Sequence, residues 1–285
     1  MSETEAPLCL KPKPLGALPR LPAGTCDSHF HVFEPGAPLA SPRSYTPQML
    51  TIADWRLYAE AAGIARGVLV QPSVYGLDNS VLLRGIESDP QHLRGVAVVA
   101  PDISPAALWE LDARGIRGIR INTRNRAGVA FEAVNELLGK VASLGWSVQF
   151  QIRAEQLAAV GALQHGDTPL VLDHMGFIRF GEPDTAERLD ALRRLLDRPN
   201  IYAKLSGPYR LTEDASYEAV GAATMALAES HPHRLIWGSD WPHTELWATM
   251  PDDADLLAAY ESWLPDPQLR QQIFVDTPQS LFFSR

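Results

Sequence analysis

Three short motifs carry the residues that could do chemistry. Asp27, His29 and His31 alternate in Cys-Asp-Ser-His-Phe-His, while His174 lies in Leu-Asp-His-Met-Gly and Asp240 in Gly-Ser-Asp-Trp-Pro-His. Imidazole and carboxylate groups are common ligands of catalytic metals and common general acids and bases. If the three motifs meet in space, they predict a site that activates a water molecule.

The elements around these motifs decide whether they meet. Hydrophobic, β-branched segments recur at intervals that are too long for hairpins, with helix-length stretches between most of them. This spacing is typical of parallel strands joined by helical crossovers. Eight such units predict an α/β fold of the (β/α)₈, or TIM, barrel type. The predicted strands are residues 25–33, 67–73, 94–100, 116–122, 146–152, 169–174, 201–206 and 234–239.

The domain organisation follows from the same pattern. Apolar residues recur at about helical spacing in residues 52–62, 130–144 and 217–230, which predicts helices of the outer ring. Residues 25–285 have about the length of a single barrel domain, which leaves residues 1–24 as an N-terminal arm. The structural rival is an open doubly wound sheet, but no glycine-rich phosphate-binding fingerprint follows any strand.

The motifs all fall at the same ends of the predicted strands. His29 and His31 end the first strand, His174 ends the sixth, and Asp240 and His243 follow the eighth. Residues at the C-terminal ends of barrel strands converge on one face, where barrel enzymes carry their active sites. We therefore expect four histidines and one carboxylate to line a common pocket.

With all three motifs in place, the chain resembles the amidohydrolase superfamily, of the amidohydrolase-2 type, and within it the 2-pyrone-4,6-dicarboxylate lactonases. The resemblance covers essentially everything after about Thr25. It implies a distorted barrel in which Asp240 is the general base and His29, His31 and His174 polarise the substrate carbonyl. The further stretches that carry it are Gln71-Pro72-Ser73, Gly118-Ile119-Arg120-Ile121-Asn122, Lys204-Leu205-Ser206-Gly207 and Trp237-Gly238-Ser239-Asp240-Trp241-Pro242-His243.

The residue types in strands four and five argue against an essential metal, because the customary metal ligands are missing there. Arg120 and Asn122 stand where many members of the superfamily have a bridging lysine, and strand five offers glutamines where many have histidine. A guanidinium beside a cation also opposes metal binding. We therefore expect no required cofactor, although His29, His31 and Asp240 could hold zinc or another divalent metal weakly.

Arginines at strand ends point to an anionic substrate. The planar guanidinium pairs with a carboxylate through two hydrogen bonds, which suits it to holding an acidic ligand. Arg126 and Arg210 match carboxylate-binding positions of the lactonases, and Gln151 stands where those enzymes have a tyrosine. The residues expected to contact substrate are Arg126, Arg210, Arg120, Ser73, Tyr45, His243 and Gln151.

Lys204 is expected to point into the barrel, because it alternates with Ser206 along its strand. An unpaired ammonium in that position would be costly. We predict that Asp27 is its partner and that this pair has a structural role.

Composition restricts the partners. A net charge of −9 argues against a nucleic-acid surface, because phosphate binding relies on clustered lysine and arginine. The apolar runs are far shorter than the roughly 20 residues of a membrane helix, and the first two dozen residues lack the pattern of a secretory signal. We expect a cytoplasmic protein whose partner is a small anionic lactone. The oligomeric state stays open.

The leading hypothesis is a hydrolase that opens a small carboxylated lactone similar to 2-pyrone-4,6-dicarboxylate, of the kind formed in the breakdown of aromatic compounds. Asp240 would accept a proton from water, and the histidines would stabilise the developing oxyanion. A lactone isomerase and a zinc-dependent decarboxylase of the same superfamily are the alternative enzymes. A barrel that binds an acidic metabolite without turning it over is the alternative outside catalysis.

Overall fold

A computed structural model describes residues 6–125, 131–164 and 166–284 of the chain. Eight parallel strands form one sheet in the order β1 to β8, each paired with its successor in the chain. The predicted (β/α)₈ barrel is confirmed. The strands are β1 (Cys26–Phe30), β2 (Arg66–Val70), β3 (Leu93–Ala97), β4 (Ile116–Asn122), β5 (Ser147–Gln151), β6 (Leu170–Leu172), β7 (Ile201–Leu205) and β8 (Leu235–Trp237).

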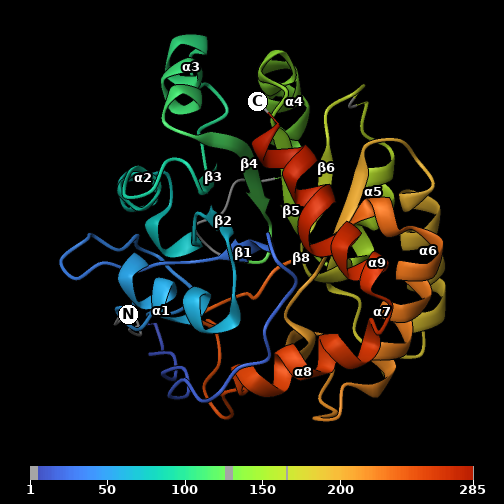
Figure 1. The fold of residues 1–285 in the computed structure, drawn as a ribbon. Coiled ribbons are helices and arrows are strands. Elements are labelled where there is room, and N and C mark those ends of the chain that lie inside the picture. Colours follow the sequence, from blue (N-terminus) through green and yellow to red (C-terminus); the bar gives the residue numbers. More distant parts are fainter. Residues whose placement is uncertain (1–5, 126–130, 165, 285) are drawn as a thin grey trace, which may run out of the picture.

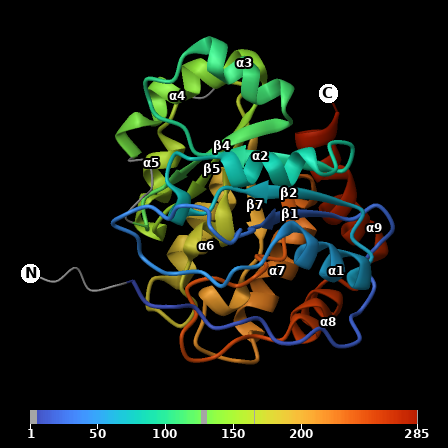
Figure 2. The same ribbon diagram turned by 90° about the vertical axis from the view of Figure 1, so that its left-hand side faces the viewer.

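Helices surround the strands in both ribbon views (Figures 1 and 2). None of the helices in the described part of the chain combines the length and apolarity needed to cross a bilayer. The α-helices are α1 (Ile52–Ala62), α2 (Ser80–Glu87), α3 (Pro105–Ala113), α4 (Val134–Val141), α5 (Leu157–Gly161), α6 (Thr185–Leu196), α7 (Glu218–Ser230), α8 (Asp253–Trp263) and α9 (Pro267–Gln271).

The barrel closes through the residues that follow β1 and β8. The backbone N–H of Asp240 donates to the carbonyl of His29 at 2.8 Å, and the N–H of His31 donates to the carbonyl of Trp241 at 2.8 Å. A Cβ on Gly238 would lie 2.6 Å from the Cβ of His29, so glycine is what permits this close approach. Closure therefore brings the first and third sequence motifs together.

Two apolar layers hold the barrel. Side chains between the strands and the helices form the larger cluster, which includes Trp146, Phe150 and Trp237. A smaller cluster combines strand side chains with Phe282 from the C-terminal segment. Its buried strand members are Cys26, Val68, Val70, Val96, Val171 and Ile236.

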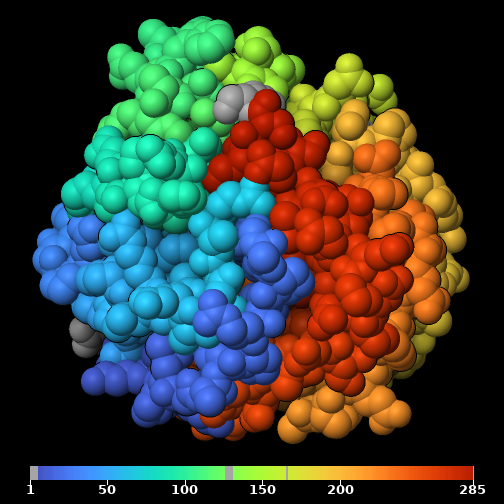
Figure 3. Space-filling view, viewed as in Figure 1, coloured from blue at the N-terminus to red at the C-terminus, as the bar shows by residue number. Residues whose placement is uncertain are grey.

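The segment before β1 packs against the C-terminal third of the chain. Figure 3 shows blue N-terminal residues directly beside red and orange ones on this face of the molecule. The N–H of Leu10 donates to the carbonyl of Leu246 at 2.9 Å, and the N–H of Glu245 donates to the Cys9 sulfur at 3.3 Å. The early residues therefore support the loop that follows Asp240.

Candidate active site

Asp27 fixes the position of the loop that carries Asp240. Its carboxylate accepts hydrogen bonds from the backbone and the hydroxyl of Ser239 at 2.8 and 2.6 Å, and from the Trp55 indole at 3.1 Å. Trp55 is available because α1 begins at a capping box in which Thr51 and Asp54 bond each other. Burial raises the pKa of Asp27 to about 6 despite these donors.

Three side chains from different strand ends converge on one point. His29 Nε2 lies 3.7 Å from Asp240 Oδ1, and His174 Nε2 lies 4.0 Å from the same oxygen. All three side chains are buried. The convergence that the motifs predicted is therefore present for His29, His174 and Asp240.

The two oxygens of Asp240 have different surroundings. Oδ2 accepts hydrogen bonds from Arg210 Nε at 2.5 Å and from the Tyr209 hydroxyl at 2.6 Å, whereas Oδ1 has no hydrogen-bond partner among the described residues. Burial opposes ionisation of this carboxyl, but Arg210 and the neighbouring histidines outweigh it and hold its pKa well below the usual range. Asp240 is thus a carboxylate with one uncommitted oxygen.

The partners of each imidazole decide which nitrogen carries its proton. His31 Nδ1 lies 2.7 Å from the carbonyl of Val70, which can only accept, so Nδ1 is protonated and Nε2 holds a lone pair. His29 Nδ1 lies 2.9 Å from the Lys204 ammonium and 3.4 Å from Asp173 Oδ1. Because the nearer ammonium can only donate, Nδ1 accepts and the proton of neutral His29 is on Nε2. His29 therefore offers an N–H toward Asp240, while His31 offers an acceptor.

His174 can also offer a donor. Its Nδ1 lies 2.8 Å from the Ser206 hydroxyl, and if that hydroxyl donates, Nε2 carries the proton. Burial is the main cause of low histidine pKa values here: it lowers that of His174 to about 4 and, with Arg120, that of His31 to about 3. The pKa of His29 is lowered by burial and by Lys204. All three imidazoles are neutral at neutral pH.

A buried ionic cluster lies beneath these histidines. Lys204 Nζ donates to Gln149 Oε1 at 2.5 Å and lies 2.9 Å from His29 Nδ1. It also forms an ion pair with Asp173 Oδ1 at 3.0 Å. Arg120 donates to the other oxygen of Asp173 from Nε and Nη2 at 3.1 and 3.0 Å. The prediction that Lys204 pairs with Asp27 is wrong: its carboxylate partner is Asp173, which directly precedes His174.

A small central cavity lies above this cluster at the strand ends. It brings together most of the predicted substrate residues with the predicted catalytic ones, except that His29 lies deeper, behind its wall. Arg126 lies outside the described residues. The cavity is lined by His31, Tyr45, Ser73, Arg120, Asn125, Gln151, His174, Arg210, Asp240, Thr244 and Glu245.

His243 lies behind Asp240 rather than on the cavity wall. Its Nδ1 is 2.9 Å from the Tyr209 hydroxyl, and its Nε2 is 3.0 Å from Asp253 Oδ1 at the start of α8. Because Tyr209 also contacts Asp240, a hydrogen-bonded chain leads from Asp240 through Tyr209 and His243 to Asp253. This chain fixes the orientation of the Asp240 carboxylate.

The backbone is strained where the site is built. Asp240 (φ 61°), His243 (φ 62°), Glu245 (φ 62°), His174 (φ 49°) and Met175 (φ 50°) all adopt the left-handed conformation that residues other than glycine rarely occupy. Such strain is maintained at functional sites because it places side chains that a relaxed backbone would direct elsewhere.

Sequence reasoning missed four residues that shape this site. Asp173 directly precedes a predicted histidine, and its place in the Leu-Asp-His-Met-Gly motif is a signal that could have identified it. Tyr209 lies in a 3₁₀ turn (Pro208–Arg210) and Asn125 and Glu245 lie in loops, and no periodicity of the sequence places such side chains. Their contacts emerge only from the folded chain.

The donor set of the convergent residues fits a zinc ion. His29, His174 and Asp240 each offer one ligand atom, and these atoms lie within 4.8 Å of one another. Two nitrogens and one carboxylate oxygen form a known zinc ligand set. This set contains His174 where the sequence analysis has His31.

Comparison with known proteins identifies the family of this chain. The amidohydrolase family model matches residues 26–283. The chain is 34% identical to a 4-sulfomuconolactone hydrolase of Rhizobium radiobacter, covering 92% of this chain and 91% of the relative. It is also 34% identical to a 2-pyrone-4,6-dicarboxylate hydrolase of Comamonas testosteroni, covering 93% of this chain and 92% of that one.

A solved structure of another protein is similar to this chain over most of its length. An Acinetobacter baumannii protein, assigned as a 2-pyrone-4,6-dicarboxylic acid hydrolase and solved with citric acid bound, superimposes with a TM-score of 0.78. It shares 28% sequence identity, and the match covers 91% of this chain and 99% of that protein. The likeness therefore extends over the whole barrel.

Proposed function

The chain belongs to the amidohydrolase family, and we propose that it is a hydrolase that opens a small lactone bearing one or more carboxylates. The observation that carries this proposal is the ionised Asp240, whose uncommitted Oδ1 lies 3.7 Å from His29 Nε2 and 4.0 Å from His174 Nε2. Arg120 and Arg210 line the same cavity as Asp240, which favours an acidic ligand. The names of the relatives and the citric acid bound to the Acinetobacter protein support the same substrate class.

In the proposed mechanism, Asp240 Oδ1 accepts a proton from water while the water oxygen attacks the lactone carbonyl. The Nε2–H of His174, which lines the cavity, donates to the oxyanion that develops, while His29 Nε2 faces Asp240 Oδ1 from behind the cavity wall. The tetrahedral intermediate then collapses, the ring C–O bond breaks, and the leaving oxygen takes the proton back from Asp240. His31 is suited to a different role from the other two histidines, because its Nε2 lone pair can orient the attacking water.

Arg210 connects substrate binding to the basicity of Asp240. In the free protein its guanidinium pairs with Asp240, and this ion pair makes the carboxylate a weak base. A substrate carboxylate that shares Arg210 takes part of that positive charge. Binding of an acidic lactone would therefore raise the basicity of Asp240 when the water is in place.

We further propose that the reaction requires no metal. If a zinc ion were bound, His29, His174 and Asp240 would hold it, and it would supply Lewis-acid activation of the carbonyl or of water. Lys204 works against this at His29, because an ammonium 2.9 Å from Nδ1 places the imidazole proton on the nitrogen that would have to bind metal. Arg120 and Lys204 also add positive charge beneath the site.

Prolonged chelation followed by desalting is accordingly expected to leave kcat/KM within about twofold of the untreated enzyme, because no step depends on a metal ion. The measurement is initial-rate hydrolysis before and after treatment, with metal content determined by elemental analysis. Loss of most activity, restored by adding zinc, would contradict the metal-free mechanism and favour a metal-dependent enzyme.

The decisive experiment for the function is a hydrolysis screen. The panel contains 2-pyrone-4,6-dicarboxylate, lactones with a single carboxylate, and neutral lactones of equal ring size. We expect turnover of acidic lactones with kcat/KM at least about tenfold above that of the neutral ones, because a charged hydrogen bond contributes about 1.5–3 kcal/mol. Saturable binding of these lactones with no turnover of any of them would contradict the hydrolase proposal and indicate a metabolite-binding barrel.

A further inference from the structure

The central cavity is too small for the proposed substrate. Its free volume is about 10 Å³, which is about the space that one water molecule needs. Pockets that bind small organic molecules typically measure about 300–1,000 Å³. Some side chain must therefore move before a carboxylated lactone can reach Asp240.

Glu245 lines the central cavity next to Arg210 and Asn125. Its Oε1 accepts a hydrogen bond from Asn125 Nδ2 at 2.5 Å, and its Oε2 lies 4.0 Å from Arg210 Nη1. Asn125 is itself fixed by a hydrogen bond from Asn122 at 3.0 Å. A carboxylate held between an amide donor and a guanidinium is the arrangement expected for a bound carboxylate ligand.

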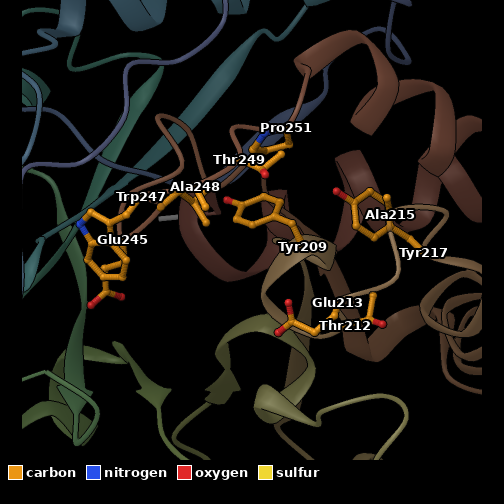
Figure 4. A pocket seen from close by; sticks show the side chains of 11 residues that line it. Tyr209, Thr212, Glu213, Ala215, Tyr217, Glu245, Trp247, Ala248, Thr249 and Pro251 are labelled. Carbon is orange, nitrogen blue, oxygen red and sulfur yellow. The ribbon is translucent and has the colours of Figure 1, made fainter.

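Space to receive this side chain lies next to it. A cavity of about 520 Å³ borders the central one, and Glu245 is the residue that lines both in the described part of the chain. In Figure 4, Glu245 and Trp247 lie at one side of this adjacent cavity, with Tyr209 between them and Tyr217. Rotation of the Glu245 side chain into this space would thus enlarge the central cavity next to Arg210.

We propose that Glu245 is a specificity-determining gate that occupies the substrate-carboxylate subsite of the free enzyme. An acidic lactone displaces it by supplying a carboxylate to Arg210 and Asn125, and Glu245 turns into the adjacent cavity. A neutral lactone has no group that replaces these bonds, so the gate selects for acidic substrates. This inference rests on the proposed function for the identity of the ligand.

The test measures binding apart from turnover. Pyridine-2,4-dicarboxylate is a planar, non-hydrolysable dicarboxylate whose affinity can be determined by titration calorimetry. Glu245→Gln keeps the size of the side chain but weakens its attraction to Arg210, and Glu245→Ala also empties the cavity. Both variants should bind this probe roughly tenfold more tightly than the wild-type protein, the lower end of what a charged hydrogen bond contributes. With an acidic lactone as substrate, KM should fall by a similar factor.

Glu213→Gln is the matched control. Glu213 lines the adjacent cavity but not the central one, and its largely exposed side chain is paired with Arg179, so the variant removes the same charge without changing the carboxylate subsite. This variant should bind the probe as the wild-type protein does. If Glu213→Gln binds the probe more tightly by the same factor as the Glu245 variants, the gate is overturned, because the effect then comes from net charge. The gate is also overturned if both Glu245 variants keep the wild-type melting temperature but bind the probe no more tightly than the wild-type protein does. Tighter binding together with no hydrolysis of any lactone would support the gate and reject the hydrolase proposal.

Discussion

Asp240→Asn is expected to lower kcat by at least about 100-fold, the usual cost of losing a general base. The amide keeps the shape of the carboxylate but cannot take a proton from water. Binding of the non-reacting dicarboxylate should not weaken, because Arg210 is released from its ion pair and stays available to the ligand. The measurements are steady-state kinetics on an acidic lactone and calorimetry with pyridine-2,4-dicarboxylate.

Asp253→Asn provides the graded control for this prediction. Asp253 reaches Asp240 through His243 and Tyr209, so its loss should disturb the orientation of the base without removing it. A smaller loss of kcat than in Asp240→Asn is expected. If Asp240→Asn hydrolyses its lactone at a near wild-type rate, the base lies elsewhere. His31 then becomes the leading candidate, because its Nε2 lone pair faces the central cavity.

The strands could be predicted because burial on both faces leaves a simple pattern. Parallel barrel strands are continuous runs of β-branched residues, unlike the alternating pattern of a half-exposed sheet. The predicted strand at residues 116–122 matches β4 in full, and residues 201–206 extend β7 by one residue. Predicted ends were less accurate where polar residues follow a strand: residues 67–73 include Ser73, but β2 ends at Val70.

The convergence of the histidines with Asp240 followed from topology, whereas the ionic partners did not. The alternation of residues along β7 indicates that the Lys204 side chain points into the barrel. It does not indicate which side chains lie at the same depth inside the barrel. Asp27 is occupied instead by Ser239 and Trp55 at the closure of the barrel. The position of Glu245 could not be predicted, because its side chain is placed by a strained loop after β8. No sequence pattern indicates the conformation of such a loop.

Lys204→Met is expected to destabilise the protein by about 3 kcal/mol, the lower end of the cost of breaking a buried ion pair. Methionine fills a similar volume, so the loss comes from the groups that the ammonium satisfies. Gln149 Oε1 and His29 Nδ1 lose their donor, and Asp173 keeps Arg120 as a cationic partner. The free energy of unfolding from urea titration measures this cost. Activity should fall as well, because His29 is no longer held with its proton on Nε2.

Lys140→Met is the matched control for this second variant. Lys140 is partly exposed and donates to Glu136 across one turn of α4 and to the carbonyl of Pro101. Its loss should destabilise the protein by about 1 kcal/mol, clearly less than the loss of Lys204. A Lys204→Met protein as stable as this control would show that the buried cluster does not depend on the ammonium. The tautomer assigned to His29 would then lose its physical basis, and zinc binding at His29, His174 and Asp240 would become the better explanation of the site.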